Sequence, residues 1–312
     1  MKLGIILLLM CCTVHAQQFP SRPIRMVVSG VAGSGSDVVG RVIAPRLTEM
    51  MGQQVIVDNR SGASGLIAAE LMARANPDGH TVWIVTMTQL ISTTLYDRHH
   101  LSRDYVPVGM MGGTPFVIVV NSGLNVKTMA EFIALAKSKP GQMMYGSSGT
   151  GASGHLCMEL LQSMSGVKFV HVPYKGSTNA LTDVIAGQMP STCFAAPTMS
   201  LITGNQKVRV LATTTRTATA LAPGLSTVAE TVPGYELNGW YGMLAPPGTP
   251  RALINRINQD ITRVVNEPAT RERLLAVGME ATPSPPEAFG EFLKRETVRW
   301  SKVLKEAGVK PQ

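Results

Sequence analysis

Apolar positions along the first hundred residues follow two alternating patterns. Continuous apolar runs at residues 24–29, 54–58 and 81–86 are typical of buried strands. Between them, residues 37–51 and 66–75 carry apolar side chains at helical spacing. Strands alternating with helices predict an α/β fold with mostly parallel sheets flanked by helices.

The same alternation continues through the middle of the chain, but two strands interrupt it. The run at 116–121 predicts a strand that leaves the first group, and 239–245 predicts one that returns to it. Between them we expect helices at 128–138, 153–164 and 179–186, and strands at 143–146, 169–172 and 208–213. This organisation predicts two domains, residues 17–121 with 241–312 and residues 122–240.

Prolines mark two helix positions. Pro45 falls inside the helix expected after Asp37, so this helix is expected to bend there or to begin later. Thr249 and Pro250 predict a further helix with Thr249 as its N-cap. An amphipathic helix is expected at 287–307.

The first sixteen residues predict export. Lys2 precedes an apolar run that ends at Cys12, and Ala16 offers a small residue for cleavage. We expect a signal peptide (residues 1–16) cleaved near Ala16 and a periplasmic protein. The alternatives are a buried first strand, or a lipoprotein acylated at Cys11 or Cys12.

Composition excludes several classes of protein. Hydrophobic residues make up 45% and charged residues 15% of 312 residues, as in a globular protein. The net charge of +8 is scattered and only 5% of residues are aromatic, so nucleic-acid binding is not expected. The charge suits an anionic small ligand, or it only aids solubility.

Few residues suggest metal or disulfide chemistry. Outside the predicted signal peptide only Cys157 and Cys193 remain, and we expect two buried free thiols rather than one bridge. The six histidines show no H-x-x-x-H spacing, and C-x-x-C does not occur. No metal and no cofactor are therefore predicted.

The first candidate site is the Gly/Ser loop at residues 29–37, between a strand and a helix. Glycines let a ligand approach the backbone, and a helix N-terminus attracts carboxylate or phosphate. The alternative is that Ser36 or Asp37 merely caps the helix. The candidate ligand-binding residues here are Gly30, Gly33, Ser34, Gly35, Ser36 and Asp37.

The second candidate site is the loop at residues 145–155, which also joins a strand to a helix. Gly149, Gly151 and Gly154 match G-x-G-x-x-G, but the next strand ends without the acid that a dinucleotide site needs. An amide-lined anion site is the favoured interpretation. Its candidate residues are Ser147, Ser148, Gly149, Thr150, Gly151 and Ser153.

These two loops fall in different predicted domains, which predicts a ligand gripped from both sides of a cleft. Tyr174 and Lys175 add a third strand–loop–helix turn, where Lys175 either faces the cleft or is a solubilising charge. No G-x-S-x-G motif occurs, so we expect no enzyme. A hydrolase pairing a loop serine with His155 is the minor alternative.

Short motifs spread along the chain resemble the Bug family of periplasmic receptors, the substrate-binding components of tripartite tricarboxylate transporters. Their order and spacing carry the resemblance, which covers nearly all of the chain after the predicted signal peptide. Besides the two Gly/Ser loops, these motifs lie at residues 19–24, 57–63, 77–79, 172–176, 240–242 and 245–250.

The resemblance implies a two-domain Venus-flytrap fold that closes on a small carboxylate. It also implies delivery of that carboxylate to the membrane permease subunits of the transporter, or presentation to a membrane sensor instead. By the resemblance, the first binding loop includes Gly33, Gly35, Ser36 and Asp37, and the second includes Ser147, Gly149, Gly151 and Ser153. Tyr174 and Lys175 would lie at the edge of a third. We expect a monomer.

The chain departs from the family pattern at three places. Gly30 stands where a ring is usual, which predicts either a larger pocket or an atypical ligand, and Ala152 stands where a hydroxyl residue is common. The family usually has an aspartate after Gly187-Gln188, whereas residues 189–195 contain no acid. Because that acid would pair with an amine, we expect a ligand without an amine, such as a di- or aromatic carboxylate.

Overall fold

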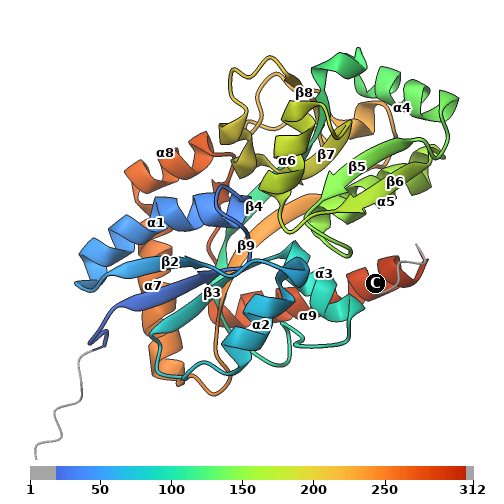
Figure 1. Cartoon of the computed structure of the whole chain (residues 1–312). Coiled ribbons are helices and arrows are strands. Elements are labelled where there is room, and N and C mark those ends of the chain that lie inside the picture. The colour runs from blue at the N-terminus through green and yellow to red at the C-terminus, as the bar shows by residue number, and fades with distance from the viewer. Residues whose placement is uncertain (1–18, 307–312) are drawn as a thin grey trace, which may run out of the picture.

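Strands and helices alternate along residues 19–306, which the computed structural model describes (Figure 1). The first half of the chain forms β1 (Ile24–Val28), α1 (Gly35–Met51), β2 (Val55–Asn59), η1 (Ala63–Gly65), α2 (Leu66–Ala73), β3 (Thr81–Thr86), α3 (Met87–Leu95), β4 (Val106–Asn121), η2 (Ser122–Leu124), α4 (Met129–Ser138) and β5 (Met143–Ser147). The second half forms α5 (Ser153–Ser165), β6 (Phe169–Pro173), α6 (Ser177–Ala186), β7 (Ser191–Ala195), η3 (Ala196–Leu201), β8 (Val208–Thr213), η4 (Val228–Glu230), β9 (Asn238–Ala245), α7 (Arg251–Asn266), α8 (Pro268–Ala276), β10 (Glu280–Ala281) and α9 (Pro286–Glu306).

The ten strands, β1 to β10, form one continuous sheet in the order β2-β1-β3-β9-β4-β7-β5-β6, with β8 and β10 also paired to β4. β1 lies parallel to β2 and β3, and β5 lies parallel to β6 and β7. β9 is antiparallel to β3 and β4, and β4 is antiparallel to β7 and β8. Each half is therefore a parallel α/β unit, and antiparallel strands join the two.

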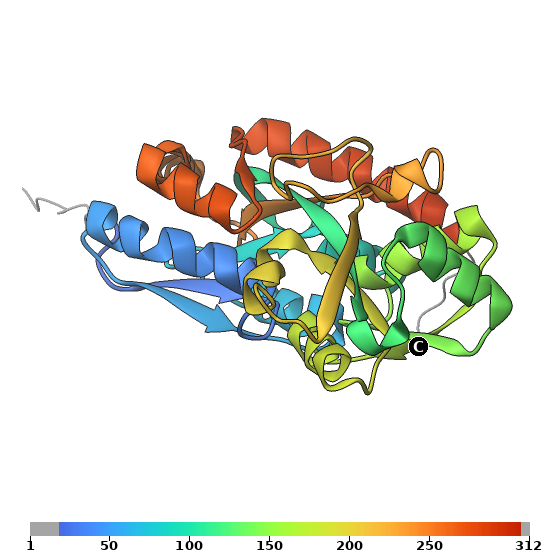
Figure 2. The same cartoon turned by 90° about the horizontal axis from the view of Figure 1, so that it is seen from above.

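The long strand β4 passes from one half into the other. It pairs with β9 as far as Pro115 and with β7 from Phe116 onward. Figures 1 and 2 show β4 and β9 running between the half that contains α1, α2 and α7 and the half that contains α4, α5 and α6. This mixed two-domain arrangement is the fold class that the sequence predicted.

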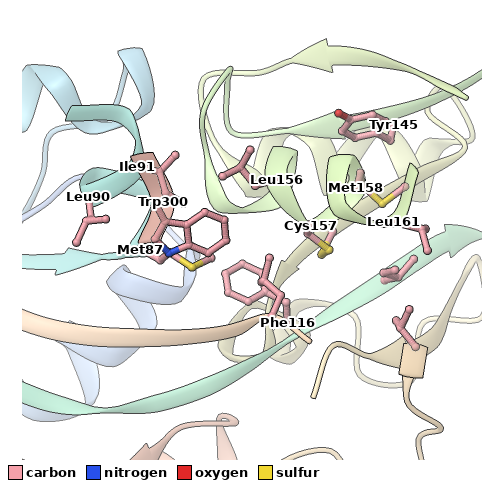
Figure 3. Close-up of a cluster of buried hydrophobic side chains, with 14 of the residues drawn as sticks. Met87, Leu90, Ile91, Phe116, Tyr145, Leu156, Cys157, Met158, Leu161 and Trp300 are labelled. Atoms are coloured by element: carbon pink, nitrogen blue, oxygen red, sulfur yellow. A yellow bond between two sulfur atoms is a disulfide. The ribbon is translucent and has the colours of Figure 1, made fainter. Parts of the chain in front are cut away.

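Helices cover both faces of the sheet and enclose separate cores. One core packs α1 and α7 against β1, β3 and β9. A larger one runs from α3 and α9 across β4 to α5, with Met87, Phe116 and Leu156 among its members (Figure 3). A third lies under α6. The larger core spans both halves, so apolar packing as well as the strands ties them together.

Two details of the predicted helices are wrong. α1 begins at Gly35, earlier than expected, and continues through Pro45 to Met51. α7 has Pro250 at its N-cap, while the Thr249 hydroxyl donates to the carbonyl of Pro246 at 2.8 Å. A helix tolerates an interior proline when packing offsets the lost hydrogen bond, and Ile43 and Leu47 of α1 are fully buried.

The expectation of two free thiols is also wrong. Cys157 of α5 and Cys193 of β7 form a disulfide, with Cα atoms 6.4 Å apart. The bridge attaches the helix after the second Gly/Ser loop to a strand that reaches the centre of the sheet.

The predicted signal peptide, with Cys11 and Cys12, lies outside the described residues. Within residues 19–306 no helix is both long and apolar enough to span a membrane.

Candidate functional site

A cavity of ≈ 80 Å³ lies where the two halves meet at the crossing strands. The half with α1 contributes Ser29, Gly30, Ser34, Gly35, Ser36, Gly62, Ser64, Gly65, Thr86, Met87, Thr88 and Gln89 to its wall. The half with α5 contributes Ser148, Ser153, Gly154, Lys175, Gly176, Ser177, Cys193, Phe194, Ala195 and Thr198. β4 and β9 contribute Thr114, Phe116, Gly239, Trp240 and Tyr241.

Four helices begin at this wall. The first residues of α1, α3, α5 and α6 are Gly35, Met87, Ser153 and Ser177, and all four line the cavity. A helix N-terminus carries unpaired N–H groups and a partial positive charge. Their convergence gives the cavity a positive potential and a supply of backbone donors, which suits an anion.

Side-chain charge on the wall has the same sign. Among the residues that line the cavity, Lys175 carries the only formal charge, and none is Asp or Glu. The wall otherwise presents hydroxyl groups, glycine backbone and a few apolar side chains. This arrangement can hold a small anion by hydrogen bonds with little electrostatic opposition.

The first loop is held by a carboxylate that is turned away from the cavity. Asp37 accepts from the backbone N–H of Gly33 at 2.9 Å, from Arg41 Nε at 3.0 Å and from Asn59 Nδ2 at 3.0 Å. Burial raises the pKa of Asp37, but hydrogen bonds from Arg41, Gly33 and Asn59 outweigh burial and lower it. Asp37 therefore stays ionised and shapes the loop from behind.

Gly30 at the start of this loop leaves less space than the sequence suggested. A Cβ atom at this position would collide with the Ser34 side chain and would lie 3.0 Å from Ser36 Oγ. The Asn59 amide also donates to the carbonyl of Gly30 at 2.9 Å. The space that a ring would need is thus filled by the loop's own serines.

The second loop is held by uncharged groups. Ser147 Oγ lies 2.7 Å from His171 Nε2, and the Gly151 N–H donates to His155 Nδ1 at 3.2 Å. The two imidazole rings lie 4.2 Å apart between centroids. Burial lowers the pKa of His155 to about 4, and burial together with the neighbouring His155 lowers that of His171 to about 3. Both rings are neutral at neutral pH.

Direct hydrogen bonds join the two halves around the cavity. Thr88 Oγ1 lies 2.6 Å from Ser153 Oγ, at the N-termini of α3 and α5. Ser64 Oγ donates to the carbonyl of Thr150 at 3.0 Å, and Thr178 Oγ1 donates to that of Ala32 at 3.2 Å. These contacts link the two halves beside the cavity.

The structure places half of the predicted site residues on the cavity wall, and the other half do not line it. Those on the wall are Gly30, Ser34, Gly35, Ser36, Ser148, Ser153 and Lys175. Those that do not line it are Gly33, Asp37, Ser147, Gly149, Thr150, Gly151 and Tyr174. The hydroxyl of Tyr174, for example, donates to Asp183 Oδ2 at 2.7 Å.

Several wall residues were missed by the sequence analysis. Thr86 to Gln89 are the most informative, because Thr86 and Gln89 form a capping box at the start of α3. A threonine followed three residues later by glutamine was a usable signal for a helix start. Thr198 and Ala195 had no such signal.

The hydrolase alternative requires a loop serine paired with His155 at the cavity. The structure shows a different arrangement. His155 contacts the Gly151 backbone and lies 3.7 Å from Glu159, while the serine beside an imidazole is Ser147, which is off the cavity wall. In the part of the chain that the structure describes, no three His, Cys, Asp or Glu residues are placed to hold a metal.

Known proteins share this sequence and fold. A protein from Pseudomonas sp. strain P51, the UPF0065 protein in the tcbD-tcbE intergenic region, is 34% identical over 310 residues, covering 97% of this chain and 92% of that protein. The structure titled R. palustris Rpa4515 with adipate has a TM-score of 0.90 and 33% identity, covering 94% of this chain and 100% of that one.

A second solved structure, MatC (Rpa3494) from Rhodopseudomonas palustris with bound malate, has a TM-score of 0.85 and 26% identity over 92% of this chain and 100% of that one. The family model described as tripartite tricarboxylate transporter family receptor matches residues 39–309. The chain therefore belongs to the tripartite tricarboxylate transporter receptor family, as its motifs had suggested.

Proposed function

We propose that this chain is a periplasmic solute-binding protein that captures a small carboxylate without an amine between its two halves. It delivers that ligand to the permease subunits of a tripartite tricarboxylate-type membrane transporter and catalyses no reaction. The residues of the predicted signal peptide direct export and are removed near Ala16. Residues 17–121 with 241–312 and residues 122–240 act as the two closing domains.

The observation that carries the proposal is the charge of the cavity wall. Four helix N-termini and Lys175 surround it, and none of residues 19–306 brings a carboxylate to its wall. Anionic oxygens are therefore stabilised by the helix N–H groups and by Lys175, whereas a cationic group on a ligand would meet groups of its own sign.

The strand β7 supports the absence of an amine on the ligand. It occupies part of the acid-free segment, and its Cys193, Phe194 and Ala195 line the cavity. An ammonium group beside these residues would be desolvated with no carboxylate to pair with. A ligand that carries only acidic and apolar groups avoids this penalty.

Two solved relatives agree with a carboxylate ligand. One structure is that of Rpa4515 with adipate and the other that of MatC with bound malate, and both compounds are amine-free dicarboxylates. The family description supports a transporter as the destination.

Thermal-shift screening of the exported protein tests the ligand class. Straight-chain dicarboxylates, aromatic carboxylates and amino acids are compared at equal concentration, because a ligand that binds only the folded state raises Tm. We expect stabilisation by one or more amine-free carboxylates. A response confined to amino acids would contradict the proposal, and a pull-down of membrane partners tests the permease assignment.

A further inference from the structure

Two buried polar atoms on the cavity wall have no hydrogen-bond partner. Within residues 19–306 these are Trp240 Nε1 and Thr198 Oγ1. Trp240 is 5% exposed and Thr198 is 1% exposed, and both residues line the cavity. Buried polar groups are nearly always paired, so an unpaired one beside a ligand cavity indicates a ligand contact.

The two residues lie on opposite sides of the crossing strand β9. Trp240 packs with α3 and α5 in the large core, and its ring lies against Phe289 and Phe292 of α9. Its neighbour Tyr241 belongs instead to the core under α1, because successive strand residues point to opposite faces. Thr198 lies in η3, which packs on α1.

Each side also carries a facing pair of helix N-termini, one from each half. On the Trp240 side, Thr88 of α3 meets Ser153 of α5. On the Thr198 side, Thr178 of α6 donates to the carbonyl of Ala32, just before α1. Each unpaired atom is therefore on the side of the cavity where backbone donors already favour a negative charge.

The chemistry of the two atoms restricts what they bind. An indole N–H only donates, so its partner must be an acceptor, and a threonine hydroxyl can donate or accept. We propose that Trp240 Nε1 and Thr198 Oγ1 are specificity-determining contacts that hold acceptor oxygens at the two ends of the ligand. This inference rests on the proposed function and adds that an acid with one polar end and one apolar end is rejected.

The burial of these two atoms is also the reason why a ligand with only one acidic end would be rejected. A ligand whose second end is a methyl group would leave the indole N–H unpaired in a dry site, and sites built to bond a polar group discriminate strongly against analogues that lack it. A dicarboxylate and the monocarboxylate of equal chain length differ only in this end group.

Isothermal titration of matched pairs tests the proposal. Succinate, glutarate, adipate, pimelate and suberate are each compared with the straight-chain monocarboxylate of equal length. We expect the wild type to bind its best dicarboxylate at least about tenfold more tightly than the matched monocarboxylate. Trp240→Phe should lose about tenfold in dicarboxylate affinity and keep its weak monocarboxylate affinity, and Thr198→Val should also lose about tenfold in dicarboxylate affinity.

Matched controls separate this effect from general damage. Trp300→Phe removes an indole that donates to Glu296 Oε2 at 3.0 Å, and Thr249→Val removes a buried hydroxyl off the cavity wall. Both should bind like the wild type. Equal affinity for both members of every pair, or unchanged dicarboxylate affinity in both Trp240→Phe and Thr198→Val, would overturn the inference while leaving carboxylate binding intact.

Indole NMR gives a readout that does not depend on a variant's stability. The chain has three tryptophans, and the Trp240 signal is the one that Trp240→Phe removes. Saturating dicarboxylate should move that indole proton downfield, as expected for a new hydrogen bond, and should leave the Trp300 signal in place. An unmoved Trp240 signal in a protein that binds the dicarboxylate would contradict a direct contact. If no carboxylate binds at all, the proposed function itself fails.

Discussion

The two Gly/Ser loops face the same cavity but are held in place by opposite means. The first is organised by an ionised network in which Asp37 bonds Gly33, Arg41 and Asn59. The second is organised by neutral histidines and by the disulfide that anchors α5. A carboxylate can therefore shape a loop at a candidate anion site, provided that it is hydrogen-bonded within the loop and turned away from the cavity.

The largest expected effect is on the second loop. Replacing both cysteines, Cys157→Ala with Cys193→Ala, removes a link across a sequence separation of 36. Loop-closure entropy predicts a loss of about 4 kcal/mol in the free energy of unfolding. Urea unfolding with and without reductant measures it, and the reductant should not affect the variant. Equal stability of the wild type in both conditions would show that the bridge contributes little.

The second-largest effect is expected when the hydrogen bonds of the first loop are weakened. Asp37→Asn should weaken the hydrogen bonds to Gly33 and Arg41, and should cost about 2 kcal/mol of stability together with most of the carboxylate affinity. Asp260→Asn is the matched control, because Asp260 is also a buried helical aspartate bonded to an arginine, Arg256, at 2.8 Å. The control should lose stability but keep its affinity. Parallel losses of affinity in both variants would show that Asp37 has no special role in the loop.

The second loop, which neutral histidines hold in place, should be the one whose contribution to stability falls at acid pH. His155 and His171 have pKa values lowered to about 4 and about 3, so they stay neutral in the folded state while the unfolded chain takes up protons below about pH 6.5. Each therefore stabilises the fold above about pH 6.5, and that contribution is lost as the pH falls towards 4. Between about pH 7 and pH 5 we expect roughly 2 kcal/mol of lost stability for each histidine.

Urea unfolding at a series of pH values checks this slope against the His171→Gln variant. The variant should be less stable at neutral pH and should lose less stability on acidification. A wild type and variant with the same pH slope would show that His171 is not the group that senses acid.

The smallest effect concerns Lys175, which lies beyond both loops. Because its side chain is exposed, Lys175→Met should weaken carboxylate binding only by about threefold to tenfold, and less at high salt. Lys168→Met, an exposed lysine off the wall, should change nothing. Titration at low and high ionic strength measures the difference, and a salt-independent loss would rule out a charge effect.

Sequence patterns predicted the outer strands and helices well, because continuous apolar runs such as that of β1 are followed by clear Gly/Ser turns. They failed at α3, which follows β3 without any turn residue between Thr86 and Met87. They also failed at β7, whose small and polar residues lack a strand pattern. The disulfide escaped prediction because the proximity of α5 and β7 arises only from the tertiary fold.

The candidate site was predictable in part for a similar reason. A glycine-rich turn before a helix marks a candidate binding loop, and both predicted loops contribute residues to the cavity wall. The positions of Trp240 and Thr198 on the cavity wall depend on where β9 and η3 lie in the folded chain, and no local pattern encodes that. The sequence likewise could not show that Asp37 points away from the cavity.

The most direct test of the central claim is an experimental structure of the protein purified from the periplasm without refolding. We expect electron density for a small amine-free carboxylate between the N-termini of α1 and α5, with its oxygens near the wall hydroxyls. Density for an amino acid whose ammonium group lies in this cavity would contradict it.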